Sequence, residues 1–250
     1  RLTLPVVRYR VSGIKRDTEG RIVTPNRIIA KVSRVEVASQ FFSPPPQEFL
    51  NELVRTREIT PEQALLAAGI PMAQDVTAEA DSGGHTDNRP LVTLLPTLLA
   101  LRDRIQGQFG YEQQLRVGAA GGLSTPAGLA AAFAMGAAYI LTGSVNQACV
   151  ESGTSEAARR MLAQAQQADT AMAPAADMFE MGVRVQVLKR GTNCSMIVGR
   201  NGRVWIKGQN TDLLIEALKK IEKEAHLENL TDKMTAFLTE KNKQVVNNQI

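Results

Sequence analysis

Residues 79–90 read Glu-Ala-Asp-Ser-Gly-Gly-His-Thr-Asp-Asn-Arg-Pro, and they follow a strand-like stretch at residues 75–78. An apolar, helix-like stretch comes next, so an acid, two glycines and a histidine meet where a strand ends. In parallel α/β proteins ligands bind at the carboxyl ends of the strands, because the loops there converge while the sheet holds them in place. This stretch therefore favours an α/β fold with a binding site at its strand ends.

The chain around this stretch alternates between expected strands and expected helices. Strands are expected at residues 28–33, 76–80, 115–119 and 139–142, and helices at residues 35–42, 91–106, 125–135 and 156–168. Such alternation is typical of right-handed βαβ units in a parallel sheet. Four strands are half of what a closed (β/α)8 barrel needs. The pattern leaves two possibilities open: a barrel whose further strands lie upstream of residue 1, or a doubly wound sheet.

The segments before this alternation are less regular. Residues 4–11 are rich in β-branched and aromatic side chains, which predicts a strand. Residues 17–20 predict a turn, after which residues 21–23 return as a short hairpin arm. Residues 47–70 predict two helices, and the second opens with Thr60-Pro61-Glu62-Gln63, a cap followed by a first-turn proline. The chain starts at Arg1 inside the first expected strand, which suggests missing upstream sequence.

Composition narrows the class of protein. The 250 residues are 44% hydrophobic, enough for a full core. The net charge of +4 is modest and gives no argument for binding nucleic acid. Cys149 and Cys194 form neither a disulfide framework nor a zinc-site spacing, which favours a reducing, cytoplasmic compartment and no metal. No apolar run approaches the roughly 20 residues that span a bilayer, so no membrane segment is expected.

Three loops contain candidate functional residues. Gly121-Gly122 opens a helix, Gly143-Ser144 follows the next strand, and backbone N–H groups in such positions can cradle a phosphate. Taken alone, each glycine pair is more simply a tight βα turn. His85 lies beside two glycines in an expected ligand-facing loop. A lone histidine is usually structural, but in this position it could orient a substrate carbonyl or donate a proton.

Five segments resemble the trans-acting enoyl reductases of polyunsaturated fatty acid and polyketide synthases, which are relatives of nitronate monooxygenases. The segments are residues 26–33, 79–90, 116–122, 142–149 and 173–182, and the resemblance extends over residues 1–192. It implies an FMN-dependent TIM barrel that reduces the carbon–carbon double bond of an enoyl thioester on an acyl carrier protein. NADPH or NADH would reduce the flavin again after each turnover. The first strands of that family are absent, so we expect an α/β fold with an incomplete TIM-barrel-like arrangement.

The same resemblance implies roles for individual residues. His85 would face the flavin and the substrate as the catalytic residue. The FMN-binding residues would be Gly121, Gly122, Gly143 and Ser144 at the phosphate, with Lys31, Asp81 and Gly84 near the isoalloxazine ring or the ribityl chain. No metal ligands are expected.

Residues 193–240 resemble the KH domain of the RNA-binding cap subunits of the exosome. The motif Gly199-Arg200-Asn201-Gly202 precedes an expected strand at residues 204–207, and helices are expected from Thr211 and at residues 231–238. In KH modules this glycine loop clamps the nucleic-acid backbone, so the resemblance implies RNA binding through Gly199, Arg200, Asn201 and Gly202. Taken alone, the motif is more simply a β-turn made by Asn201-Gly202.

The sequence therefore predicts a partial reductase-like domain at residues 1–192, a partial KH-like segment at residues 193–240, and a polar tail at residues 241–250 that frays. No Gly/Ser-rich spacer separates the first two segments. Three functions remain open: a truncated FMN-dependent enoyl reductase, an RNA-binding exosome cap-like module, or an inactive chimera of the two. The first is preferred because it rests on more matching residues.

Overall fold

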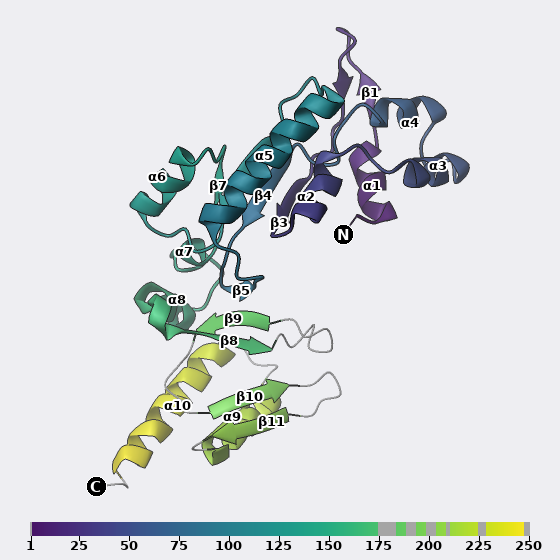
Figure 1. The fold of residues 1–250 in the computed structure, drawn as a ribbon. Coiled ribbons are helices and arrows are strands. Elements are labelled where there is room, and N and C mark those ends of the chain that lie inside the picture. Colours follow the sequence, from purple (N-terminus) through teal and green to yellow (C-terminus); the bar gives the residue numbers. More distant parts are fainter. Residues whose placement is uncertain are drawn as a thin grey trace. The chain divides into compact units, whose positions relative to one another are not determined.

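The computed structural model describes residues 2–174, 184–188, 194–198, 204–208, 211–224 and 229–247. The chain divides into two compact units (Figure 1). Unit 1 comprises residues 1–82 and 87–142, and unit 2 comprises residues 83–86 and 143–250. The domain boundary expected between residues 192 and 193 lies outside the described residues.

Unit 1 is built on a four-stranded parallel sheet. Its strands are β3 (Ile29–Val32), β4 (Asp75–Glu79), β6 (Arg116–Ala120) and β7 (Ile140–Leu141), which lie side by side in that order. All four strands predicted from the alternation are therefore confirmed. In the described part of the chain, β3 and β7 each have one neighbour in this sheet, so the sheet is open rather than closed into a barrel.

One face of this sheet carries the main hydrophobic core. Helices α2 (Val35–Phe42) and α5 (Leu91–Phe109) lie over that face, as Figure 1 shows, and α6 (Pro126–Ala134) adds Ala132 to the same core. Alternate strand residues point into it, because successive side chains of a strand face opposite sides. The buried strand residues are Ala30, Val32, Val76, Ala78, Val117 and Ala119. The other face of the sheet carries the intervening, more polar positions.

A second core in unit 1 corrects one sequence prediction. Residues 4–11, expected as a strand, form helix α1 (Leu4–Val11). Val7, Val11 and Ile14 recur at helical spacing, are at most 2% exposed, and belong to one buried cluster with residues of helices α3 (Gln47–Arg55) and α4 (Pro61–Ala67). Burial of this stripe outweighs the β propensity of valine, which is a weak and context-dependent preference.

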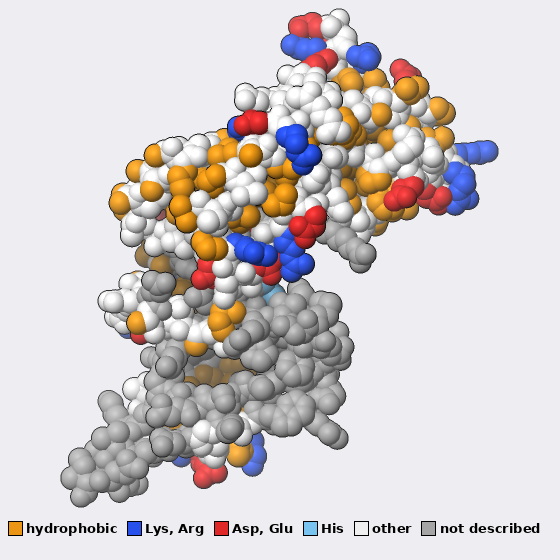
Figure 2. All heavy atoms as spheres, in the orientation of Figure 1, with side chains coloured by type: hydrophobic (Ala, Val, Ile, Leu, Met, Phe, Trp, Pro, Cys, Tyr) orange, Lys and Arg blue, Asp and Glu red, His pale blue; other side chains and the backbone are white. Residues whose placement is uncertain are grey.

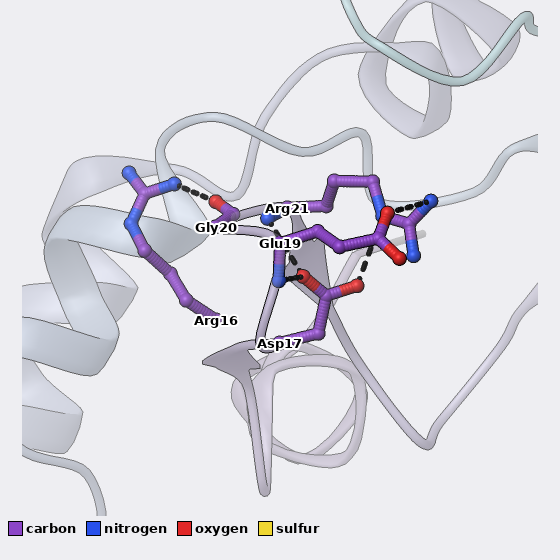
Figure 3. A network of polar contacts seen from close by, with 5 residues as sticks. All are labelled: Arg16, Asp17, Glu19, Gly20 and Arg21. Atoms are coloured by element: carbon purple, nitrogen blue, oxygen red, sulfur yellow. Dashed lines mark hydrogen bonds and ion pairs between the residues drawn. The ribbon is translucent and has the colours of Figure 1, made fainter.

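The predicted turn and returning arm are confirmed, but the first arm of this hairpin is Lys15–Arg16 and not residues 4–11. Strands β1 (Lys15–Arg16) and β2 (Ile22–Val23) pair antiparallel, and Figure 3 shows Asp17 at the centre of their turn. Asp17 Oδ1 accepts hydrogen bonds from the backbone N–H groups of Glu19 (2.9 Å) and Arg21 (3.0 Å), while Arg21 Nε donates to Oδ2 (2.9 Å). One short acidic side chain thus closes the turn, as aspartate commonly does.

The start of helix α4 and the end of helix α5 follow capping signals in the sequence. Thr60 Oγ1 accepts from the N–H of Gln63 (3.1 Å), and Gln63 Oε1 accepts from the N–H of Thr60 (2.9 Å), which confirms the predicted cap of α4. Helix α5 continues beyond the expected residue 106 and ends at Gly110, whose φ of 59° is the left-handed conformation that glycine tolerates best.

Unit 2 contains two small sets of strands. Strands β5 (Gly84–His85), β9 (Arg184–Leu188) and β8 (Thr170–Pro174) form one antiparallel sheet, and β10 (Cys194–Val198) pairs antiparallel with β11 (Val204–Gly208). Its helical segments are α7 (Ser144–Gln147), α8 (Glu156–Gln164), the 3-10 turn Gln167–Asp169, α9 (Thr211–Glu224) and α10 (Leu230–Asn247). Helix α10 packs against α9 and α8. Residues 241–247, expected to fray, are therefore helical.

Candidate functional site

The carboxyl ends of the four parallel strands meet at one edge of the sheet. Val32 pairs with Ala78, Glu79 with Ala120, and Ala120 with Leu141, so the strands end nearly level. We call this the carboxyl edge. In Figure 2, basic and acidic side chains gather on unit 1 near this edge. Lys31, Asp81, Gly121 and Gly122, which the sequence singled out, lie in unit 1 within or just after these strands, so the edge is the candidate site.

Lys31 and Glu79 join the ends of the first two strands. Lys31 Nζ lies 2.6 Å from Glu79 Oε1, and the two side chains are 53% and 20% exposed. An ion pair this exposed contributes little to stability, about 0–1 kcal/mol. Its effect is positional, because it holds an ammonium group at the carboxyl edge. Lys31 was predicted as a site residue from the sequence, but no role was predicted for Glu79, the first residue of the stretch 79–90.

The loop after β4 folds back onto the end of β3. Asp87 accepts hydrogen bonds from Ser33 Oγ (2.5 Å) and Arg34 Nε (3.1 Å), and the backbone N–H of Asp81 donates to the carbonyl of Arg89 (2.9 Å). The hydrogen bonds from Arg34 and then Ser33 hold the pKa of Asp87 below its ordinary value. The contact of Ser33 and Arg34 with Asp87 could not be predicted from the sequence, because these residues are more than 50 positions apart.

Gly121 lies where the loops after β4 and β6 touch. Its φ is +105°, and a Cβ atom at this position would lie 2.6 Å from the carbonyl oxygen of Ala80 and 2.9 Å from that of Asp81. Gly122 also has positive φ, +63°, and faces the Asp81 carbonyl with more room. Only glycine allows this backbone-to-backbone approach. The structure thus brings Asp81, Gly121 and Gly122 together.

The same glycine loop leads directly into helix α6. Thr125 is the N-cap, and its Oγ1 accepts from the N–H of Gly128 (3.1 Å), while Pro126 occupies the first turn. The amino end of a helix favours an anion, because its N–H groups and dipole point that way. The carboxyl edge therefore combines an open glycine backbone with a helix start, which suits a phosphate group.

The remaining predicted residues lie in unit 2. Gly84 and His85 form the short strand β5, in which His85 pairs with Val185, so the histidine expected in a loop is exposed on a strand. Gly143 and Ser144 begin the segment of α7, and Ser144 Oγ lies 3.7 Å from the place of a Cβ on Gly83. Gly84 and Gly143 have open space where a Cβ would stand. The four candidates Lys31, Asp81, Gly121 and Gly122 belong to unit 1.

The predicted RNA-binding residues Gly199, Arg200, Asn201 and Gly202 lie outside the described residues, as does most of the segment at residues 173–182. Strand β11 and helix α9, expected on either side of residues 209 and 210, are confirmed.

The polar face of the sheet carries a further cluster that sequence analysis missed. Arg116 Nε and Nη2 donate to the two oxygens of Asp75 (2.6 and 2.9 Å), and its guanidinium lies 5.8 Å from the ring centroid of Tyr139. The Tyr139 hydroxyl lies 3.0 Å from Thr77 Oγ1. Burial raises the pKa of Tyr139 above its ordinary value. The polar residues at alternate positions of β4, together with Arg116 at the start of β6, were the signal that could have indicated this cluster.

Two other kinds of site are absent from the described residues. They contain no group of three or more His, Cys, Asp or Glu side chains arranged to bind a metal ion. None of the helices that the structure describes combines the length and apolar character needed to cross a membrane.

Residues 24–249 match the nitronate monooxygenase family, and the chain therefore belongs to this family. Its members, like the related enoyl reductases, are flavin-dependent oxidoreductases. The match runs beyond residue 192, where sequence analysis expected the reductase-like part to end.

Individual relatives narrow the comparison. The chain is 52% identical over 193 residues to one of the subunits of the polyunsaturated fatty acid synthase of Thraustochytrium sp., covering 76% of this chain and 13% of the relative. It is 49% identical over 190 residues to polyketide biosynthesis protein PksE from Bacillus subtilis, covering 76% of this chain and 25% of the relative. The chain thus spans at most a quarter of the length of these relatives.

The fold resembles that of a solved enzyme domain. The crystal structure of the enoyl reductase domain of MlnA, from the macrolactin biosynthesis cluster of Bacillus amyloliquefaciens, aligns with a TM-score of 0.72 at 36% identity. The alignment covers 99% of this chain and 56% of that one. The parallel sheet of unit 1 is therefore an α/β arrangement similar to that of an enoyl reductase domain.

A smaller part of the chain has a different relative. Exosome complex component Rrp4 from Methanosarcina barkeri is 50% identical over 66 residues, a quarter of this chain and a quarter of the relative. This similarity is of the same kind as the resemblance of residues 193–240 to the cap subunits of the exosome, but it covers only a minor part of the chain.

Proposed function

We propose that the chain is part of an FMN-dependent enoyl reductase, acting on an enoyl thioester attached to an acyl carrier protein and drawing its electrons from NADPH or NADH. Membership of the nitronate monooxygenase family supports a flavin, and the names of the relatives support a place in fatty acid or polyketide synthesis. The observation that carries the proposal is the contact of Gly121 with the loop after β4, directly before the start of α6.

Within unit 1, Gly121 and Gly122 leave their backbone without side chains beside a helix start, so their N–H groups would approach phosphate oxygens of a bound FMN. In the same proposal the backbone of Gly143, which has open space beside it, would contribute from unit 2. Ser144 would add a hydroxyl donor. Asp81, Gly84 and Lys31 would accompany the rest of the cofactor, with the Lys31 ammonium offsetting negative charge. The bound flavin would supply hydride transfer to the β carbon, and a protein group or water would supply the proton to the α carbon.

The chain's own residues would hold and polarise the substrate. Glu79 fixes the Lys31 ammonium at the edge through their 2.6 Å ion pair. An imidazole N–H of His85 would donate a hydrogen bond to the thioester carbonyl, which favours negative charge on that oxygen as the double bond is reduced. The incomplete barrel expected from the sequence would need further strands to exclude water from this site.

Flavin binding tests the proposal with a matched pair of variants. Gly122 and Gly110 have similar positive φ values, +63° and +59°, so alanine strains both backbones alike, but only Gly122 lies at the carboxyl edge. We expect the chain to bind FMN, seen by quenching of flavin fluorescence, and Gly122→Ala to weaken that affinity at least about tenfold. Gly110→Ala should leave it unchanged. A chain that binds no FMN, or two variants with equal affinity, would contradict the proposal.

Turnover tests the role of His85 separately. Oxidation of NADPH with an enoyl-acyl carrier protein should fall about 100-fold or more in His85→Leu, which has no hydrogen-bond donor, if the imidazole hydrogen bond stabilises the developing charge, while FMN affinity stays unchanged. Equal loss of FMN affinity would instead make His85 a structural residue. Normal turnover by His85→Leu would remove it from the mechanism.

RNA binding is the second candidate function, favoured by the similarity to Rrp4. Labelled single-stranded RNA should bind in a salt-dependent manner, and Gly202→Asp should abolish binding by placing a carboxylate near the RNA backbone. Gly153→Asp is the matched control, because a Cβ there meets nothing within 4 Å. Binding that both variants retain would exclude the KH-like site, and a chain that binds neither RNA nor FMN would be the inactive chimera.

A further inference from the structure

A cavity of about 370 Å³ lies at the opposite, amino edge of the same sheet. Asp75 begins β4 and lines it, together with Ile28 just before β3 and Tyr111 in the loop before β6. All of its lining residues belong to unit 1. We call it the amino-edge pocket. None of the residues assigned to the proposed flavin site lines it, so it needs an explanation of its own.

Two guanidinium groups line the amino-edge pocket. Arg10 is only 5% exposed, and it donates from Nε to the carbonyl of Pro71 (3.1 Å) and from Nη1 to the carbonyl of Asn26 (2.6 Å). Arg27 is exposed and lines the same cavity. Burial, and then the nearby charge of Arg27, lower the pKa of Arg10 to about 10. Neutral carbonyls alone solvate Arg10, and neither arginine has an ion-pair partner in the described part of the chain.

The carboxylates of the pocket do not cancel this charge. Both oxygens of Asp75 are already bonded to Arg116, which lies outside the lining, so that pair is neutral by itself. Glu112 is exposed and offsets one of the two arginines. The pocket therefore keeps a surplus of one positive charge, and a ligand with a single negative charge would balance it.

The rest of the lining is apolar and partly aromatic. The rings of Phe109 and Tyr111 stack at 5.5 Å between centroids with 18° between their planes, and Phe109 is 40% exposed although it lines the cavity. Ile28 and Ile70 add aliphatic surface. The Tyr111 hydroxyl donates to the carbonyl of Phe42 (2.9 Å) and is thus not available to a ligand as a donor. A flat or apolar body would be buried here, next to the arginines.

We propose that the amino-edge pocket binds a small organic monocarboxylate with an apolar body. The carboxylate pairs with Arg10 and Arg27, whose planar guanidinium groups match its geometry, and the apolar body packs against Phe109 and the isoleucines. The volume lies in the range of small-molecule sites, about 300–1,000 Å³. The site is independent of the proposed flavin chemistry at the other edge.

Benzoate is the probe that tests this, titrated into the full chain without flavin by calorimetry. Arg27→Gln removes an exposed charge, so the chain should still fold, and we expect benzoate affinity to fall about tenfold or more, as for loss of a charged hydrogen bond. Arg104→Gln is the matched control, because Arg104 is also exposed and lies outside the lining. Glu112→Gln should strengthen binding, since it removes the opposing charge.

The contrary outcomes are equally specific. No benzoate binding at millimolar concentration, or equal affinity in Arg27→Gln and Arg104→Gln, would overturn the site. Benzyl alcohol binding as well as benzoate would overturn the need for a charge, and inorganic phosphate competing as well as benzoate would overturn the choice of a carboxylate with an apolar body.

Discussion

A Cβ atom on Gly118 would lie 2.2 Å from the ring of Tyr139, so the ring rests directly on the backbone of β6. Because the Tyr139 hydroxyl also contacts Thr77, the ring cannot move away without losing that contact. We expect Gly118→Ala to lower the free energy of unfolding by about 1–3 kcal/mol, as overpacking does. Urea denaturation measures it. Gly107→Ala, in an open position of α5, should instead raise stability by about 0.5–1 kcal/mol.

A double-mutant cycle separates the ring from other effects of Gly118→Ala. In a Tyr139→Ala background the added methyl group has no ring to meet, so its cost should nearly vanish. An undiminished cost in that background would place the strain in the backbone of β6 instead.

Arg116→Leu should destabilise unit 1 more than a similar change on the surface. Asp75 is 8% exposed, and loss of both hydrogen bonds from Arg116 leaves a buried carboxylate unpaired, at a cost of about 1–3 kcal/mol. Arg55→Leu is the control, because Arg55 binds Glu52 through two similar bonds at an exposed site. Its effect on urea unfolding should stay below about 1 kcal/mol. Equal losses of unfolding free energy in the two variants would show that the burial of Asp75 does not add to the cost of removing its partner.

Asp87 should make stability depend on pH in acid. Its pKa in the folded chain is below the ordinary value because Arg34 and then Ser33 bind the carboxylate. The contribution of these bonds is therefore complete above the unfolded pKa, about 3.9, and is lost as the pH falls through the folded pKa. The difference in unfolding free energy between wild type and Asp87→Asn should shrink over that range. Arg34→Gln should raise the pKa of Asp87, and a difference that is constant with pH would contradict the assignment.

Thr60→Ala should weaken helix α4 by about 0.5–2 kcal/mol, the usual cost of losing an N-cap. Both bonds of the capping box, to and from Gln63, depend on Thr60 and its backbone. Thr97→Ala serves as the comparison, because Thr97 only bonds back to the carbonyl of Thr93 within α5. Thermal unfolding should show a clear loss in the first variant and almost none in the second.

The parallel strands were predictable because each obeys a local rule. β4 alternates polar and apolar residues and β6 is mostly apolar; both end in glycine-containing loops, and a helix follows each, the second with the N-cap Thr125. Helix α1 was missed for a local reason too, since valine-rich composition was weighed above the spacing of Val7 and Val11. The helical spacing can be read from the sequence, but the surface of α3 and α4 against which these residues pack cannot.

The candidate site was predictable only in part, because its contacts are long-range. The glycines of Gly121-Gly122 were correctly expected at a strand end, yet nothing in the sequence pairs Ser33 with Asp87, 54 positions away. His85 shows the same limit. Its strand β5 forms because residues near Val185 pair with it. A strand of two residues is too short to show a periodic pattern, so the sequence does not predict this pairing.

The close approach at Gly121 also gives a criterion for judging other chains of this family. Any side chain at the matching position must push the neighbouring loop aside, since its Cβ would lie 2.6 Å from the backbone of Ala80 and no flexible group is there to yield. A family member with a larger residue at that position must therefore have a different loop conformation at the carboxyl edge of its sheet, whatever its overall sequence identity. We expect such a protein to hold its ligand differently.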